Sequence, residues 1–248
     1  MEFVGSAYSA LQARRQNRCA PFPHNTLKAA LVNTTADYLP YLSQGIVLSL
    51  ALGTASFIAA TLIGLLLALI RDGASALVKA LISIYISVFR ALPELLTILL
   101  AYYGSIAFTR SVGMPELSPF AAALLAFGVQ IGSYACQIFS DAYRAVPRGL
   151  LEAAHSVGMP DYLVNIRVAI PLMLRLAAPS LGSLLLVVIK LTAIASAIGV
   201  TELTRRAQIV SGATHDPLTA FGYAAAIYLA MSAVLTLVQR RLEIAKEL

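Results

Sequence analysis

Long apolar stretches, each sufficient to cross a bilayer as a helix, dominate the pattern of this chain. The first, Gly45–Ile70, runs for 26 residues without a charged side chain, whereas about 20 helical residues span a hydrocarbon core roughly 30 Å thick. Four more follow at about Ala80–Phe108, Pro119–Tyr143, Ala177–Gly199 and Leu218–Val238. Lipid offers no partner to exposed backbone groups, and the stretches are too long for barrel strands. The pattern predicts an all-α integral membrane protein with five transmembrane helices, the second interrupted around Pro93.

The composition agrees with this pattern. Hydrophobic residues make up 59% of the 248 residues, charged residues only 12%, and the mean hydropathy is +0.79. A soluble domain carries roughly 25% charged residues, so a soluble fold is excluded. Two cysteines exclude a disulfide scaffold. The net charge of +6 does not indicate nucleic acid binding, because the basic residues lie between the apolar spans.

The distribution of these basic residues predicts the orientation of the spans. Nine lie on one side of the predicted membrane: Arg71, Lys79, Arg144, Arg148, Arg167, Arg175, Arg240, Arg241 and Lys246. Four lie near the spans on the other side: Lys28, Arg110, Arg205 and Arg206. The positive-inside rule therefore predicts an external N-terminus and a cytoplasmic C-terminus. Residues 1–35 are predicted to form a polar leader, and residues 36–248 a single membrane domain.

Small residues repeat along the first span. Gly45, Ser49, Gly53, Ser56, Ala60 and Gly64 follow one another at steps of three or four and so share one helix face. Small side chains let helix backbones approach closely in lipid. We therefore predict a packing role for this face, without chemistry.

Polar residues form a stripe along the third span. Gln130, Tyr134, Gln137 and Asp141 are spaced to share one helix face. Polar groups are costly in lipid, so the stripe should face the bundle interior, a partner subunit or a watery pathway. Interhelical hydrogen bonding and a substrate pathway remain equal alternatives for the two glutamines. Lys190, near the middle of the fourth span, is expected to pair across an interface or to meet an anionic substrate group.

Catalytic and metal motifs are missing from the sequence. It holds no G-x-x-x-x-G-K-[ST] phosphate loop, so the chain is not expected to hydrolyse ATP by that route. Its three histidines are scattered, with no spacing typical of a metal site. We therefore predict neither an enzyme nor a bound metal.

The connection between the third and fourth spans, residues 147–175, is the most informative segment. Pro147 bars a clean continuation of the third span. Glu152–Val157 suits a short helix that stops at Gly158, and Pro160 with Asp161 suits the first turn of a second helix running to Pro171. Two short helices with exposed apolar side chains are typical of a docking element for a soluble partner.

This segment resembles the EAA loop of ABC importer permeases, whose pattern is E-A-A, three residues, G, nine residues and I-x-L-P. Glu152-Ala153-Ala154 and Gly158 match outright, and Val168, Ile170 and Pro171 fall at the matching spacing with two conservative departures. We call residues 147–175 the coupling loop.

Further fragments resemble the polar amino acid subfamily of these permeases. They are Tyr38-Leu-Pro-Tyr-Leu-Ser-Gln-Gly45, Phe89-Arg90-Ala-Leu-Pro93 and Ile198-Gly-Val-Thr-Glu202-Leu-Thr-Arg-Arg206-Ala. Only about residues 1–35 fall outside the resemblance.

The resemblance implies a type I ABC importer permease with five spans in the cytoplasmic (inner) membrane. It implies a second permease copy or a sister permease, cytoplasmic ATPase subunits and an extracytoplasmic solute-binding protein as partners. ATP and Mg would bind to the ATPase, with no cofactor on this chain. Contact with the ATPase is carried over to Glu152, Ala153, Ala154, Gly158, Asp161, Tyr162 and Pro171.

The implied cargo is a polar amino acid or a related compound such as an opine, and the pathway candidates are Gln130, Tyr134, Gln137, Lys190 and Thr192. Two acidic positions that family members often show are replaced here, by Gln137 and by Leu191. We therefore expect an acidic partner group on a non-identical sister subunit. The alternatives are an ABC permease for another small polar solute, a non-ABC channel or secondary carrier, and a structural membrane subunit.

Overall fold

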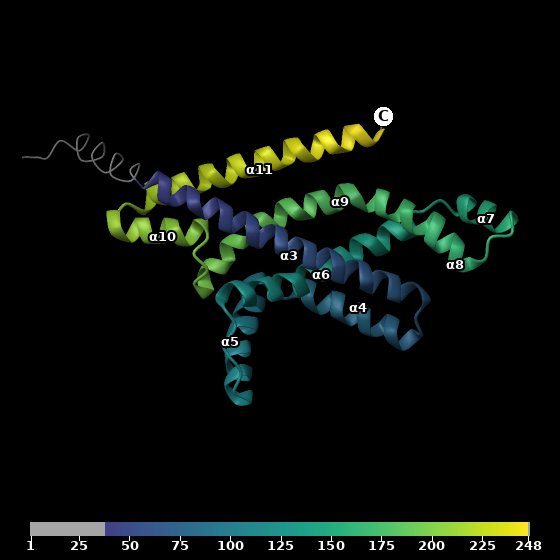
Figure 1. The fold of residues 1–248 in the computed structure, drawn as a ribbon, viewed down its shortest axis with the longest axis horizontal. Coiled ribbons are helices and arrows are strands. Elements are labelled where there is room, and N and C mark those ends of the chain that lie inside the picture. Colours follow the sequence, from purple (N-terminus) through teal and green to yellow (C-terminus); the bar gives the residue numbers. More distant parts are fainter. Residues whose placement is uncertain (1–37, 248) are drawn as a thin grey trace, which may run out of the picture.

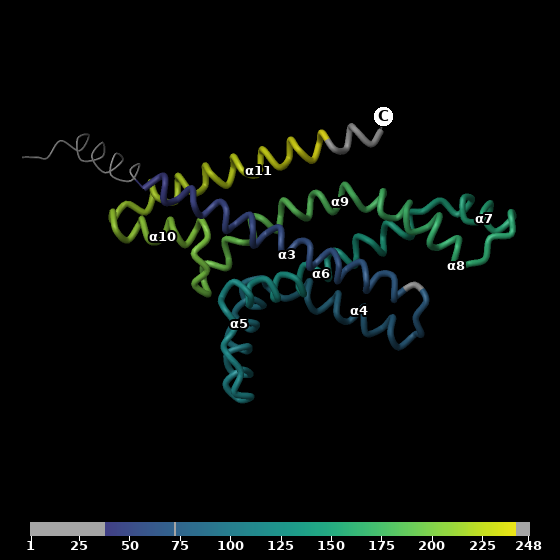
Figure 2. The backbone as a smooth tube through the Cα atoms, viewed as in Figure 1, coloured from purple at the N-terminus to yellow at the C-terminus, as the bar shows by residue number. Residues whose placement is uncertain are grey.

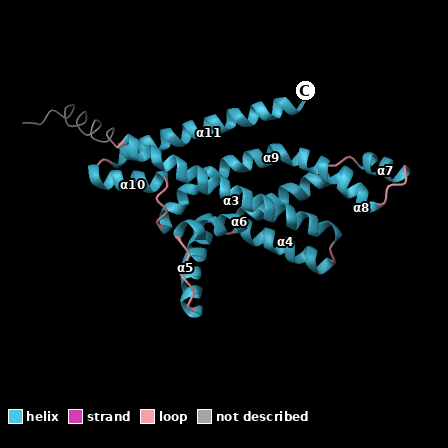
Figure 3. Cartoon of the chain, viewed as in Figure 1, coloured by secondary structure: helices cyan, strands magenta, loops and turns pink. Residues whose placement is uncertain are grey.

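The computed structural model describes residues 38–247, and all their regular elements are helical (Figure 3). The predicted leader, residues 1–35, lies outside the described residues. The elements are α3 (Leu39–Gly73), α4 (Ala76–Ala91), α5 (Glu94–Val112), α6 (Pro119–Arg144), α7 (Arg148–Ser156), α8 (Asp161–Val164), the π-helical η2 (Asn165–Ala169), α9 (Ile170–Leu191), the 3-10 segment η3 (Thr192–Ile198), α10 (Leu203–Thr214) and α11 (Pro217–Glu247).

Five stretches of the described chain are long and apolar enough to cross a membrane, which confirms the predicted number. They are Leu39–Arg71, Glu94–Val112, Pro119–Arg144, Asp161–Ile198 and Pro217–Arg241. The predicted interruption of the second span is a complete break, because α4 ends at Ala91 and α5 begins at Glu94. Only α5 of this pair meets the length and hydropathy of a span.

The small residues of α3 form its packing face, as predicted. Ser49, Ser56 and Ala60 are fully buried. A Cβ atom added at Gly64 would lie 2.5 Å from the Cβ atom of Ala135 on α6. One added at Gly53 would lie 2.9 Å from the Ile189 side chain of α9. The backbone of α3 therefore approaches its neighbours closely, as small interface residues permit.

The break at Pro93 is held by hydrogen bonds from α6. Proline has no N–H and crowds the preceding turn, which leaves carbonyl groups of that turn without a helical partner. The Gln130 amide donates to the carbonyl oxygen of Leu92 at 3.0 Å and to that of Phe89 at 3.4 Å. The Tyr85 hydroxyl of α4 donates to the Val129 carbonyl of α6. These bonds fix the point where α4 and α5 diverge.

Glu202, directly before α10, joins this helix to α3 and α11. Its side chain is fully buried and caps α10 by accepting the N–H groups of Thr204 and Arg205, each at 2.8 Å. The Tyr228 hydroxyl of α11 donates to the same carboxyl group at 2.8 Å, and the Ser49 hydroxyl of α3 at 3.5 Å. Burial raises the pKa of the Glu202 carboxyl group above its ordinary value.

Different helices lie at the two ends of the bundle. Figure 1 shows α7 and α8 projecting at one end, beyond the end of α3, while α10 and the start of α11 lie at the other. The helices α3, α6 and α9 run between these ends, and α5 turns away from them. The coupling loop is thus separated from the α10 end by the length of the bundle.

A substitution at Gly64 tests the close approach of α3. Gly64→Leu should lower the free energy of unfolding by about 3 kcal/mol or more, because its side chain would overlap the α6 backbone. Gly104→Leu is the matched control, since a Cβ atom at that helical glycine of α5 has nothing within 4 Å. Thermal unfolding of both variants in detergent is the measurement. Equal losses at the two positions would contradict the packing described.

Candidate functional site

The coupling loop begins with α7. Pro147 stands directly before this helix, where a missing N–H is harmless, and α7 starts at Arg148. The sequence predicted a helix over Glu152–Val157, so the observed helix starts one turn earlier. Its end agrees with the prediction, since Ser156 is the last helical residue.

Gly158 ends α7 in the manner predicted. Its φ angle is +83°, in the left-handed region that glycine adopts without strain. The Gly158 N–H donates to the His155 carbonyl at 2.9 Å, and the Met159 N–H to the Ala154 carbonyl at 3.2 Å. These bonds satisfy the last carbonyl groups of α7 and turn the chain toward α8.

The predicted end of the second helix at Pro171 is wrong. Asp161 does begin a helix, but α8 passes through η2 into α9, and the helical run continues to Ile198 (Figure 2). The wider π turn explains this continuity. A π segment already breaks the regular ladder of hydrogen bonds, so the missing N–H of Pro171 falls where the ladder is irregular.

Apolar packing and a hydrogen bond attach the coupling loop to the bundle. Leu151 and Ile170 pack against the buried cluster that contains Phe139 of α6. Ala154 and Val164 are buried, with exposed fractions of 8% and 3%. The Tyr143 hydroxyl of α6 donates to the Asn165 side chain at 2.8 Å. A displacement of α8 would therefore be transmitted to both α6 and α9.

Other side chains of the coupling loop are exposed, and three of them are large and apolar. The exposed fractions are 78% for Val157, 64% for Tyr162 and 60% for Ile166. Glu152 and Ala153 of α7 are exposed as well. We call these five residues the docking surface. Tyr162 and Ile166 lie at the start of the 38-residue stretch Asp161–Ile198, which is longer than the roughly 20 residues that a span needs. Exposed large apolar side chains that cluster at such an end are typical of an interaction site.

The structure also places Asp161 and Pro171, two more residues that were predicted to contact the ATPase. Asp161, at the start of α8, lies 3.6 Å from the His155 Nδ1 atom across the Gly158 turn. Both side chains are largely exposed, so this pair contributes little to stability. Pro171 is exposed at the beginning of α9.

The predicted pathway residues of α6 have separate surroundings. Gln130 is buried and donates to the carbonyl groups at the Pro93 break. The Tyr134 ring lies beneath the Arg90 guanidinium, whose Cζ atom is 5.4 Å from the ring centre, so Arg90 of α4 contacts α6. The Gln137 amide donates to the Asp141 carboxylate at 2.8 Å.

The candidates at the end of α9 differ in exposure. Lys190 is exposed on the isolated chain and forms no ion pair with any described residue. Thr192, the first residue of η3, is fully buried, and its hydroxyl donates to the Ile189 carbonyl in the last turn of α9. A single chain therefore does not gather the five predicted pathway residues into one enclosed site.

Sequence reasoning missed two of these contacts. Neither the stacking of Arg90 on Tyr134 nor the bond from Tyr143 to Asn165 leaves a spacing signal, because each joins different helices. Five helical stretches long and apolar enough to cross a membrane define the class of multi-pass membrane proteins.

Comparison with known proteins names the family. Residues 60–245 match the family described as binding-protein-dependent transport system inner membrane component. The chain belongs to this family and is a multi-pass membrane protein.

Curated relatives support the assignment. The arginine ABC transporter permease protein ArtQ of Haemophilus influenzae is 33% identical over 64% of this chain and 73% of its own length. The octopine transport system permease protein OccQ of Rhizobium radiobacter is 36% identical over 60% of this chain and 66% of its own. The L-cystine transport system permease protein TcyB of Bacillus subtilis is 33% identical over 84% and 87%.

Solved structures share the fold. A chain from a crystal structure of an amino acid ABC transporter with histidines is 30% identical, with a TM-score of 0.78 over 85% of this chain and 96% of its own length. A chain of the inward-facing MetNI methionine ABC transporter is 18% identical, with a TM-score of 0.72 over 84% and 97%. The type I importer permease fold is therefore shared.

A pair of alanine substitutions tests the turn at Gly158. Gly158→Ala should weaken the coupling loop by about 1–2 kcal/mol, because the new Cβ atom is strained at a positive φ angle. Gly149→Ala in α7 has no such strain and should favour the helix slightly. Hydrogen exchange of the α7 amides should therefore accelerate in the first variant and not in the second. Similar rates in both would contradict the role of the turn.

Proposed function

We propose that this chain is the permease subunit of an ABC importer that moves a polar amino acid or a related compound, such as an opine, across the inner membrane. The docking surface carries the proposal, because a separate ATPase needs an exposed contact beyond the spans. The names of the relatives, which include arginine, octopine and cystine transport, support the cargo class. A solute-binding protein would deliver the cargo from outside.

The proposed orientation places the coupling loop in the cytoplasm and the α10 end outside. The excess of basic residues supports it, because most lie at the ends of helices on the coupling-loop side. Arg148 and Arg167 belong to the loop itself. An ATPase that binds nucleotide in the cytoplasm would then meet the docking surface directly.

The proposed coupling follows the continuous helical run from α8 to η3. Tyr162 lies near the start of this run and Lys190 near its end. Binding and hydrolysis of ATP would move the docking surface, and the run would carry that motion into the membrane. The ATPase would thereby favour one of two conformations of the permease, through its unequal affinity for them.

Removal of the Tyr162 side chain tests this docking. Tyr162→Ala should reduce copurification with the ATPase at least tenfold and abolish stimulated ATP hydrolysis, because a large interface aromatic is lost. Leu218→Ala, at an apolar side chain 85% exposed at the other end, should preserve both. Unchanged copurification of the Tyr162 variant would contradict ATPase contact at this surface.

Cysteine labelling tests the orientation. Val157→Cys and Leu218→Cys are introduced separately, with Cys19 and Cys136 replaced by serine. A membrane-impermeant maleimide should label the Leu218 variant in intact spheroplasts, and the Val157 variant only after permeabilisation. The reverse pattern would invert the proposed topology.

The proposed cargo site is shared between two subunits. Lys190 is exposed at membrane depth on the isolated chain, where a charged group is costly unless a partner or water-filled cavity receives it. We propose that Lys190 and Gln137 contribute to a site whose acidic group lies on a sister permease. A carboxylate of the cargo would then meet Lys190, and its ammonium group the sister subunit.

Transport by the reconstituted heteromer tests this site. Lys190→Ala should reduce uptake about tenfold or more, because a charge-assisted contact to the cargo is lost. Arg240→Ala, which removes an exposed cation near the end of α11, should transport at the parent rate. Parent activity of the Lys190 variant would exclude this assignment and leave the docking result unaffected.

A further inference from the structure

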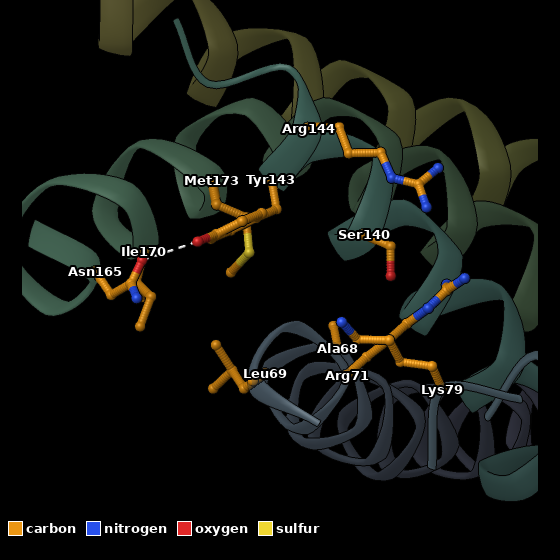
Figure 4. A pocket seen from close by; sticks show the side chains of 11 residues that line it. Ala68, Leu69, Arg71, Lys79, Ser140, Tyr143, Arg144, Asn165, Ile170 and Met173 are labelled. Atoms are coloured by element: carbon orange, nitrogen blue, oxygen red, sulfur yellow. Dashed lines mark hydrogen bonds between the residues drawn. The ribbon is translucent and has the colours of Figure 1, made fainter. Parts of the chain in front are cut away.

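A cavity of about 560 Å³ lies between the coupling loop and the adjoining ends of α3, α4 and α6 (Figure 4). Its volume is within the usual range for small-molecule sites, about 300–1,000 Å³. Arg71, Lys79, Ser140 and Arg144 gather on one side of the cavity in Figure 4. None of these residues was among the predicted pathway or coupling residues.

The cavity carries positive charge. Arg71 comes from the end of α3, Lys79 from α4 and Arg144 from the end of α6. None of the described residues that line the cavity is acidic; the side chain of Asp72 lies outside the described part. Asp141 offsets Arg144 from a distance of 3.9 Å, and it is itself largely exposed. Arg71 and Lys79 have no ion pair among the described contacts.

Arg71 holds a donor without a partner. Its Nη1 atom is buried and makes no hydrogen bond to any described group, while its Nη2 atom donates to the Ser83 hydroxyl at 3.3 Å. A buried, unpaired donor on a charged group is costly, and an anion would remove that cost. The positive-inside rule accounts for basic residues on this side, but not for a buried, unpaired guanidinium nitrogen.

The remaining wall is mostly apolar. Leu69, Ile170 and Met173 line it, with Asn165 beside them. The cavity lies at the end of the first span, where the membrane surface is expected. An apolar wall facing a basic one at this depth suits a lipid whose headgroup carries a negative charge, and basic pockets between transmembrane helices bind such headgroups.

We propose that this cavity binds a phosphate group, supplied by an anionic lipid headgroup or by free phosphate. Arg71 and Lys79 would donate to the phosphate oxygens, with the Ser140 hydroxyl beside them. The lipid source rests on the membrane placement in the proposed function. A bound phosphate would connect the α3–α4 end of the bundle to α6, the helix that leads into the coupling loop.

Native mass spectrometry of the purified full chain tests the proposal. Detergent solutions contain phosphatidylglycerol, phosphatidylcholine or inorganic phosphate as separate probes. The parent should retain phosphatidylglycerol over phosphatidylcholine, and Arg71→Gln and Lys79→Gln should each reduce retention about fivefold or more. Arg240→Gln removes the same charge from the same predicted side and should retain the lipid. Lipid retention is measured on the isolated chain. It therefore does not depend on whether the chain docks an ATPase or transports a cargo.

Each outcome decides between the sources or against the site. Selective loss of phosphatidylglycerol from the Arg71 and Lys79 variants supports the lipid. Stabilisation of the parent by inorganic phosphate without lipid selectivity, absent in these variants, supports free phosphate. Equal loss in the Arg240 variant, or no difference between parent and variants with either probe, overturns the proposal. If Arg71→Gln fails to fold, Lys79→Gln decides, because Lys79 is exposed.

Discussion

The close approach of the α3 backbone to its neighbours is the constraint on which the rest of the structure depends. Helices in lipid gain little from hiding apolar surface, so association relies on tight packing. Gly45, Gly53 and Gly64 bring α3 against α10, α9 and α6 in turn, at separations that a Cβ atom would not allow. One helix thereby sets the position of three others, including α6 and α9, which hold four of the five predicted pathway residues.

Side-chain hydrogen bonds hold the irregular points of the backbone, which are the Pro93 break, the start of α10 and the π segment. Within or beside a membrane, a broken helix needs polar partners from elsewhere in the protein. Gln130 supplies them at the Pro93 break. At the start of α10 the adjoining residue Glu202 accepts the free N–H groups, and Tyr228 and Ser49 tie it to other helices. Tyr143 fixes the side chain of Asn165 in the π segment. In each case the broken segment is tied to another part of the fold, which stabilises it in one arrangement.

The same architecture connects the docking surface to the membrane. Because Pro171 does not end the helix, the segment that carries Tyr162 is continuous with α9. The proposed phosphate cavity lies beside the first part of this run, against Asn165 and Ile170. A ligand there would act at the junction between the loop and the spans.

Periodicity and spacing by themselves determined the number of spans, the packing face of α3 and the stop of α7 at Gly158. Each depends on neighbouring residues: the length of an apolar run, the repeat of a helix, or the preference of glycine for a positive φ angle. The sequence did not determine that the helix continues through Pro171, that Gln130 supports the Pro93 break, or that Arg71 faces a cavity. The passage through Pro171 depends on a π turn that has no spacing signal. The other two need groups from different helices to meet, and only tertiary packing decides which side chains supply them.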